Sequence, residues 1–288
     1  MDANTTQKVH NAYIYTEENE LDRFWREDAP KTLIKFFSAK YEADGTNYFL
    51  KHIKERTMWL ASPSSFNDPF DCVVNINYES EAYRFVNLVL HRLVGGVEAR
   101  KIINSDLFET CIKESSVLLE QNMSKVYNET EYKIYVTCFS EPDNLFSLRM
   151  WGHYAQNHSG VCAEYDFYDV NNLCPFGCIP VMYTDVYSHK NYTVGTVENT
   201  RNILNLIYNK ASEWEYEKEW RVAYYLDEDK QLGFSSKCEL PKRIYLGCKV
   251  NETLKRDILM LCRDNGIELF QMALKPGSYE LFYEKIDV

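Results

Sequence analysis

The segment "SEWEYEKEWRVAYY", residues 212–225, decides the fold that we expect for this chain. Its second half is a short apolar and aromatic run, typical of a strand inside a sheet. Its first half alternates glutamates with aromatic residues and a lysine. In an extended chain, Glu217 and Glu219 would project from the same face. Neighbouring carboxylates at a strand entrance are either neutralised by cations such as Arg221 or serve chemistry, and both interpretations are open.

Other segments predict the remaining elements. Apolar or alternating runs bounded by turn residues predict strands at 32–37, 58–62, 132–141, 160–168, 178–187, 242–250, 267–274 and 281–288. Helical periodicity marks 79–128, which we interpret as a helical insert, and also 145–158 and 196–215. The sequence therefore predicts a single α+β domain over 1–288, with a mixed or mostly antiparallel sheet core that carries the insert.

The composition excludes several classes of protein. The 288 residues are 45% hydrophobic, which excludes a disordered chain. A net charge of −11 gives no general attraction to nucleic acid. No segment approaches the roughly 20 apolar residues of a membrane span, and the first ten residues lack the apolar core of a signal peptide. The nine cysteines are scattered along the chain, which favours reduced thiols over a disulfide framework. We therefore expect a cytoplasmic protein without a membrane partner.

A polar loop follows the predicted strand at 58–62. The motif "WLASPSSFNDPFDC", residues 59–72, places serine, asparagine and aspartate side chains around Pro69, where they could line the rim of a cleft. The relevant residues are Ser62, Ser64, Asn67, Asp68 and Asp71. As a plain turn, the same side chains would bond nearby backbone amides instead. We expect this loop and the 217–219 segment to meet at one cleft, because both are polar segments next to apolar strands.

A third motif, "CFSEPDNLFSLRMWGHYAQNHSGVCAEYDF", covers residues 138–167. Its helix would place Met150, Trp151 and Tyr154 on one face. Aromatic residues in such positions usually pack inward, so we expect Trp151 and Trp220 to be structural. Tyr154 is most simply a core residue as well, and it is also a candidate for binding a ligand.

These motifs together resemble a bacterial family named domain of unknown function 2971. The resemblance rests on "WLASPSSFNDPFD", "CFSE", "MWGHYAQNHSGVC" and "WEYEKEWR" and extends from about residue 32 to 250. The family's name assigns no reaction. The resemblance suggests a bacterial protein, in a setting such as defence against phage.

A second resemblance is to ADP-ribosyltransferases. Lys35 on an early strand, Ser62 with Ser64 on the next, and Glu217-x-Glu219 before a later strand follow that family's order, with a lysine where an arginine or histidine is usual. The resemblance implies NAD as substrate, Glu219 as the catalytic carboxylate and Glu217 as the residue that orients the acceptor, a protein or nucleic acid. The cofactor-binding set that we predict is Lys35, Ser62, Ser64, Asn67, Asp68, Tyr154 and Arg221.

Two other functions fit the sequence. A metal-dependent phosphodiesterase or nuclease would gather carboxylates around magnesium or manganese, and the candidates are Asp68, Asp71, Glu141 and Glu217. A noncatalytic sensor would bind a nucleotide or a phage protein and use the acidic residues as structural ion pairs. No zinc-ligand spacing supports a dedicated metal site, and the oligomeric state does not follow from the sequence.

Overall fold

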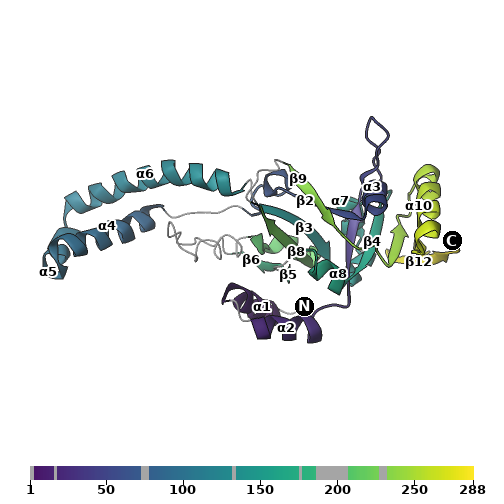
Figure 1. Cartoon of the computed structure of the whole chain (residues 1–288), viewed down its shortest axis with the longest axis horizontal. Helices are drawn as coiled ribbons and strands as arrows, with labels where there is room; N and C mark the ends of the chain where they lie inside the picture. The colour runs from purple at the N-terminus through teal and green to yellow at the C-terminus, as the bar shows by residue number, and fades with distance from the viewer. Residues whose placement is uncertain are drawn as a thin grey trace.

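The computed structural model describes residues 3–15, 18–72, 78–131, 134–174, 177–185, 207–226 and 232–288. Within them the fold is α+β, as predicted, with a mixed and mostly antiparallel sheet (Figure 1). The strands of the main path, in spatial order, are β12 (Leu281–Ile286), β11 (Glu268–Leu274), β10 (Arg243–Leu246), β4 (Val161–Asp166), β1 (Thr32–Phe37), β3 (Ile134–Ser140), β2 (Thr57–Ala61) and β9 (Gly233–Lys237). Strand β8 (Glu219–Tyr225) pairs with β3, and β5 (Cys178–Pro180) pairs with β8. A separate parallel pair joins β6 (Met182–Thr184) to β7 (Asn209–Ala211).

Each segment predicted as a strand overlaps at least one strand, and 32–37 coincides with β1. The segment 178–187 is divided into two short strands, β5 and β6, which belong to different sheets. The apolar run that follows the glutamates is β8, which pairs antiparallel with β3 from Ile134↔Tyr225 to Ser140↔Glu219. The sequence did not reveal β7 and β9. Strand β7 has three residues and β9 reads "GFSSK", so neither carries the apolar alternation that predicts a strand.

Three groups of helices surround the sheet. The N-terminal α1 (Ala3–Tyr15) and α2 (Glu18–Glu27) lie beside β5 and β8, and α3 (Tyr48–Glu55), α7 (Leu148–Tyr154), α8 (Phe167–Asn171) and α10 (Glu252–Asn265) adjoin the sheet. The segment predicted as a helical insert is helical and consists of α4 (Tyr78–Val94), α5 (Gly96–Ile103) and α6 (Asp106–Glu131). These three helices form an arm that projects from the sheet, with α5 at its tip (Figure 1).

The sheet has a core on each face. In β1, Leu33 packs in the larger cluster with Ile53 of α3 and Ile258 of α10. The next residue, Ile34, packs in a second cluster with Trp151 of α7. This alternation is the period-two pattern of a strand covered on both sides.

The central strand β3 is paired unevenly. One edge pairs with β8 over the whole strand. On the other edge, β1 contributes the single pair Ile34↔Ser140 and β2 the single pair Ala61↔Val136. From Ile34 onward in β1, and from Ser140 back toward Cys138 in β3, the two strands therefore separate, which leaves room for side chains between them.

The helix predicted at 196–215 is wrong for residues 209–215, whereas the described Ile207 is helical. Residues Asn209–Ala211 form β7, and Ser212–Glu217 form a 3-10 turn that ends with Lys218 in the left-handed conformation (φ 44°). The remainder of that predicted helix, apart from its Ile207–Tyr208 portion, lies outside the described residues. Glu217 thus belongs to the turn and Glu219 opens the strand, so strand alternation does not relate them. The helix predicted at 145–158 is likewise shorter, since Pro142–Phe146 is a 3-10 turn before α7.

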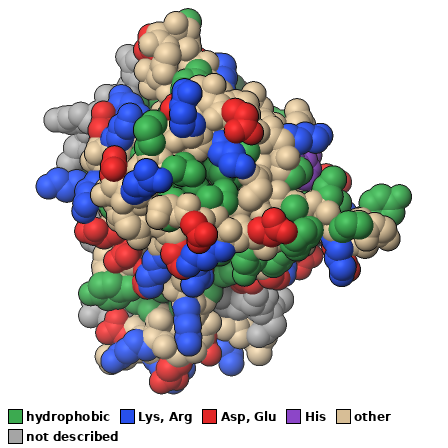
Figure 2. All heavy atoms as spheres, turned by 90° about the vertical axis from the view of Figure 1, so that its right-hand side faces the viewer, with side chains coloured by type: hydrophobic (Ala, Val, Ile, Leu, Met, Phe, Trp, Pro, Cys, Tyr) green, Lys and Arg blue, Asp and Glu red, His purple; other side chains and the backbone are tan. Residues whose placement is uncertain are grey.

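The charged surface side chains are mixed in sign. Figure 2 shows the side of the molecule away from the arm, where Lys and Arg are interspersed with Asp and Glu. On the neighbouring strands β10, β11 and β12, Arg243 and Lys285 both pair with Glu268, at 3.0 and 2.6 Å. This face offers no continuous basic surface for a nucleic-acid backbone. Within the described part of the chain, no helix has both the length and the apolar character that crossing a bilayer requires.

Candidate functional site

A small cavity of about 190 Å³ opens where β1 and β3 separate. Aromatic and aliphatic side chains form much of its wall, and polar groups converge on it from five parts of the chain. The polar residues include Lys35 of β1, Asn67 and Asp71 of the loop after β2, Tyr154 of α7, Lys210 of β7, and Glu217 and Glu219 around the start of β8. A concave, mostly apolar site with a few convergent polar groups is the usual form of a small-molecule site.

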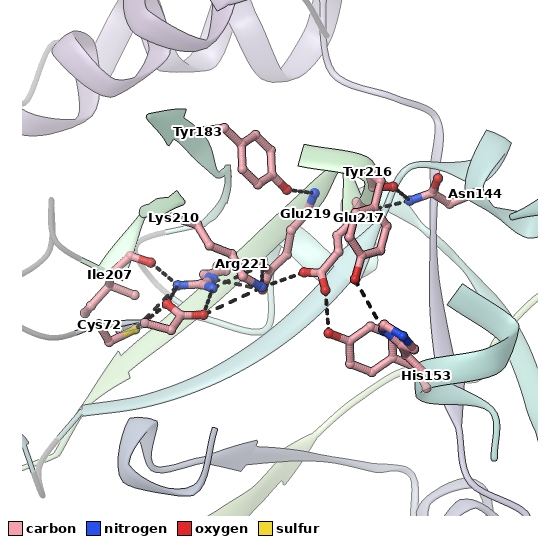
Figure 3. Close-up of polar contacts among 12 residues, drawn as sticks. Cys72, Asn144, His153, Tyr183, Ile207, Lys210, Tyr216, Glu217, Glu219 and Arg221 are labelled. Carbon is pink, nitrogen blue, oxygen red and sulfur yellow. Dashed lines mark hydrogen bonds and ion pairs between the residues drawn. The ribbon is translucent and has the colours of Figure 1, made fainter. Parts of the chain in front are cut away.

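Arg221 anchors the floor of this site and is fully buried. Its guanidinium bonds both oxygens of Asp71 (Nη1–Oδ1 2.8 Å, Nη2–Oδ2 2.6 Å) and both oxygens of Glu219 (Nε–Oε1 2.8 Å, Nη2–Oε2 3.0 Å). It also donates to the carbonyl oxygen of Ile207 (Figure 3). The planar fork of arginine can bind two carboxylates at once. The positive charge of Arg221 is therefore neutralised by carboxylates of the protein itself.

Lys210 is the second buried cation (Figure 3). Its Nζ lies 2.5 Å from Glu217 Oε2, 2.9 Å from Glu219 Oε2 and 3.7 Å from Asp71 Oδ2. It also lies 4.9 Å from the ring centre of Trp214. The ammonium therefore sits among three carboxylates and offsets part of their negative charge.

The carboxylate of Glu217 bridges Lys210 and α7. One oxygen accepts from Lys210, and the other accepts a short hydrogen bond from the hydroxyl of Tyr154. Asn67 lies within hydrogen-bonding reach of the same hydroxyl. The turn that carries Glu217 is fixed by Asn144, whose side-chain amide donates to the carbonyl oxygens of Tyr216 and Glu217 at 3.0 and 2.6 Å.

Lys35 reaches the cavity from the opposite wall. Because β1 and β3 are separated there, its Nζ donates to the carbonyl oxygen of Cys138 at 2.8 Å and lies 5.4 Å from the ring centre of Phe139. Burial lowers the pKa of Lys35, although Glu219 acts in the opposite direction. A lysine in these surroundings favours an anionic group at the cavity.

The two glutamates have different electrostatic surroundings. Burial and the nearby charge of Glu219 raise the pKa of Glu217, while Lys210 opposes the rise. Burial alone would raise the pKa of Glu219 as well, but Arg221 and Lys210 hold that pKa well below its usual range. Glu219 is thus a permanently ionised partner of two cations, and Glu217 is the carboxyl group closer to taking up a proton.

The structure brings together part of the predicted set. Glu217, Glu219, Lys35, Asn67 and Tyr154 all line the cavity, so the loop after β2 and the glutamate segment do share one site. Arg221 lies directly behind it and contacts Asp71 and Glu219.

Besides Arg221, three predicted residues do not line the cavity. Ser62 and Ser64 bond each other at 2.9 Å, and Ser62 is fully buried. The carboxylate of Asp68 accepts from the amide of Phe70 at 2.9 Å, within its own loop. These contacts are the local turn bonds that such residues commonly make.

Sequence reasoning missed Lys210 altogether, and it named Asp71 as a residue of the cleft rim and of the metal hypothesis but not as a partner of Arg221. Lys210 fell inside the segment expected to be helical, where a lysine usually faces solvent. One feature of the sequence could have pointed to Lys210. Within residues 212–221 the acidic side chains outnumber the basic ones. A surplus of buried carboxylates requires a cation from elsewhere.

The carboxylates proposed for a metal site are not gathered together. Asp71 and Glu217 line the cavity, whereas Glu141 lies near Trp220, with Nε1–Oε1 at 3.5 Å, and at a separate depression beside Asp28. Among the described residues, no three Asp, Glu, His or Cys side chains have positions suited to one metal ion. The cation among the cavity carboxylates is the ammonium of Lys210.

Comparison with known proteins gives one match. Residues 150–222 match the model of a family described as protein of unknown function (DUF2971). This segment is about a quarter of the chain and includes Tyr154, Lys210, both cavity glutamates and Arg221. It supports the resemblance expected from the motifs over that part of the chain. No curated protein and no solved structure matches, and none of these comparisons shows a likeness to ADP-ribosyltransferases.

Proposed function

We propose that the cavity binds the reacting part of NAD and that the chain is an ADP-ribosyltransferase-like enzyme. The observation that supports this is the convergence of Glu217, Tyr154, Asn67 and Lys35 on one cavity, from separate parts of the chain. In such a reaction a carboxylate holds a ribose hydroxyl and stabilises positive charge near the anomeric carbon. The order of a lysine on an early strand and Glu-x-Glu before a later one suggested the same chemistry.

Glu217 is the carboxylate that we assign to the ligand. Both oxygens of Glu219 are already bonded to Arg221, and Lys210 bonds one of them as well. Glu217 sits at the cavity wall with one bond to Tyr154 and one to Lys210. In this proposal Glu219 positions Lys210, and Lys210 positions Glu217. The role first expected of Glu219 thereby passes to its neighbour two residues earlier.

The proposed reaction breaks the bond between the ribose C1′ and the nicotinamide nitrogen. The bonding electron pair leaves with nicotinamide, and positive charge develops at C1′ and the ring oxygen. The ionised carboxylate of Glu217 stabilises that charge. The acceptor then forms a bond to C1′ and loses its proton, which Glu217 takes up. A carboxyl group with a raised pKa suits this last step.

The size of the cavity limits what enters it. A volume of about 190 Å³ is below the roughly 300 Å³ at which drug-sized pockets begin. It is suited to one ring, such as nicotinamide or ribose, and Phe36, Phe66 and Phe139 supply apolar wall for a planar group. The phosphates would remain at the mouth, where an anionic group can approach Lys35.

The test is release of nicotinamide from NAD labelled in the nicotinamide ring. We expect turnover by the wild type and a loss of about 10²- to 10³-fold in Glu217→Gln, because the amide keeps the shape but not the charge. Glu215→Gln is the matched control, since Glu215 lies in the same turn and is exposed. Thermal unfolding of both variants shows whether a loss of turnover is a loss of folded protein.

A second label, on the adenosine, identifies the acceptor. Free ADP-ribose indicates water, whereas label on protein or nucleic acid from a bacterial lysate indicates transfer. Saturable NAD binding without nicotinamide release would overturn the enzyme proposal and leave a nucleotide sensor. Cleavage of phosphate esters that stops when divalent cations are chelated would overturn it in favour of the phosphodiesterase or nuclease.

A further inference from the structure

The helical arm carries an apolar surface that its own two long helices do not cover. Between α4 and α6, the buried apolar side chains are Ala82, Phe108 and Ile112, and Val86, Leu90 and Leu119 are partly buried against them. Nine hydrophobic side chains in the described parts of these two helices are at least 37% exposed, and five of them, Phe85, Leu88, Val89, Leu107 and Leu118, lie toward one side of the hairpin. We call these five residues the arm stripe.

The arm stripe lies on one side of the hairpin. At about 100° per residue, Phe85 and Leu88 lie roughly 60° and 120° from Ala82 in one rotational sense, and Val89 lies roughly 20° from it in the same sense. The α6 members Leu107 and Leu118 lie a similar angle from the face of Phe108 and Ile112, in the same rotational sense. Because α4 and α6 run in opposite directions and face each other, the same sense of rotation places both sets on the same side.

We propose that the arm stripe is the interface of a dimer, in which two arms pack face to face as an antiparallel four-helix bundle. The arms would be related by a two-fold axis across them, so that α4 lies on α4 and α6 on α6 of the second copy. A hairpin of two helices cannot enclose a core by itself, and a second hairpin completes it. A closed two-fold interface uses the same patch on both copies.

The spacing of the stripe residues fits this symmetry. If Phe85 faces Leu88 of the second copy, the axis crosses α4 between residues 86 and 87. If Leu107 faces Leu118 of the second copy, the axis crosses α6 between residues 112 and 113. At 1.5 Å per residue, both crossings lie roughly 10 Å from the tip of the arm. One axis therefore satisfies both helices.

The placement and area of the stripe also fit. The arm projects from the sheet (Figure 1), so antiparallel arms place the two sheets at opposite ends of the bundle, where they do not collide. From their exposed fractions, the five side chains present roughly 600 Å² per copy, near the ~800 Å² that one partner buries in a standard interface. Arg92 and Glu114, both exposed, lie on the same side of the hairpin as the stripe and add polar groups to it.

The experiment measures the mass of the full chain in solution by sedimentation and light scattering across a concentration series. We expect twice the chain mass of 34.0 kDa. Leu118→Glu should raise the dissociation constant at least 100-fold, because it places two charges in the interface. Val117→Glu is the matched control, since Val117 is 50% exposed on the same helix but about 100° away from the stripe. Circular dichroism verifies that both variants stay helical.

Cross-linking tests the arrangement. In a Cys111→Ser background, chains with Leu107→Cys and chains with Leu118→Cys are treated with a short bismaleimide, separately and mixed. The antiparallel pairing predicts far more cross-linked dimer in the mixture than in either sample alone. A monomeric wild type, a dimer unaffected by Leu118→Glu, or equal loss in the Val117→Glu control would each overturn the proposal. If a different protein binds the arm stripe, the purified wild type would be a monomer.

Discussion

Arg221 and Asp71 form a two-point ion pair between residues that are 150 positions apart in the chain. Both side chains are buried, and the two bonds are 2.8 and 2.6 Å long. The next residue, Cys72, has a left-handed backbone (φ 59°), an uncommon conformation for a residue with a side chain. The loop after β2 thus has a strained backbone next to Asp71, whose side chain points toward β8. The same loop forms one wall of the cavity.

We expect Arg221→Lys to lower the free energy of unfolding by about 2–4 kcal/mol. Lysine keeps the charge but has a single ammonium in place of the planar fork, so Asp71 and Glu219 cannot both keep two-point contacts. Equilibrium unfolding in guanidinium chloride measures the change. Arg243→Lys is the control, because its pairs with Glu164 and Glu268 lie on a side chain that is 44% exposed. Equal losses of unfolding free energy at both positions would show that the burial and geometry of the Arg221 ion pair contribute nothing to stability.

Lys210→Met should destabilise the protein by about 3–5 kcal/mol at pH 7, because it removes a buried cation and leaves Glu217 and Glu219 without it. The deficit should shrink as the pH is lowered from 7 to 5. Without Lys210 the pKa of Glu217 rises further, and uptake of a proton relieves the repulsion between the two carboxylates. Unfolding curves at several pH values measure this. A deficit that stays constant between pH 7 and pH 5 would contradict the assigned charges.

His52 should make stability depend on pH. Burial lowers the pKa of His52 to about 4 from an ordinary value of 6.5, and its Nε2 bonds the hydroxyl of Tyr165 at 2.9 Å. Between pH 4 and 6.5 the unfolded chain therefore binds more protons than the folded chain. The free energy of unfolding therefore rises by about 2–4 kcal/mol as the pH increases across this window. The same contribution to stability disappears when the pH falls from 6.5 to 4.

His52→Gln should remove this part of the pH dependence, because glutamine does not titrate. The difference in unfolding free energy between wild type and variant, followed from pH 7 to pH 4.5, isolates the contribution of His52 from that of the carboxylates. The exposed His153, changed to glutamine, provides the comparison. The explanation fails if wild type and His52→Gln lose stability in parallel.

Trp151→Ala should lower stability by about 3–5 kcal/mol through the cavity it leaves. The indole is 1% exposed, packs edge-on against Phe36 and donates to the carbonyl oxygen of Leu145 at 2.7 Å. Trp59, which is 51% exposed, gives the comparison Trp59→Ala, for which we expect a much smaller loss. Chemical denaturation of both variants measures the two losses of unfolding free energy. A Trp151→Ala protein of normal stability would mean that the indole is not part of the core.

The sequence identified the strands whose pattern is local. The apolar run of β8 and the segment 32–37 have the composition of buried strands, and both are strands as predicted. Helices α1 and α2 were not foreseen, although Leu21, Phe24 and Trp25 have the spacing of one helix face. The aromatic stacking of Phe24 on Trp220 shows why that face is buried, and only the tertiary structure contains this contact.

The candidate site was predictable in part for the same reason. Glu217 and Glu219 attract notice because unpaired carboxylates next to an apolar strand are costly. Lys210 does not, since its role depends on the parallel pairing of β7 with β6 and on a turn that reverses toward β8. Within the polar loop, sequence could not distinguish Asp68, which bonds its own backbone, from Asp71, which bonds Arg221.

The position of β3 has a consequence for synthesis of the protein on the ribosome. Its partners on one edge, β1 and β2, are made before it, whereas β8 on the other edge begins only at Glu219. A nascent chain that has just released β3 must hold one edge of its central strand unpaired until β8 emerges. Such an edge is a template for pairing with other chains. Premature termination before Glu219 should therefore yield aggregating fragments, and a pause in translation within this interval should increase the demand for chaperones.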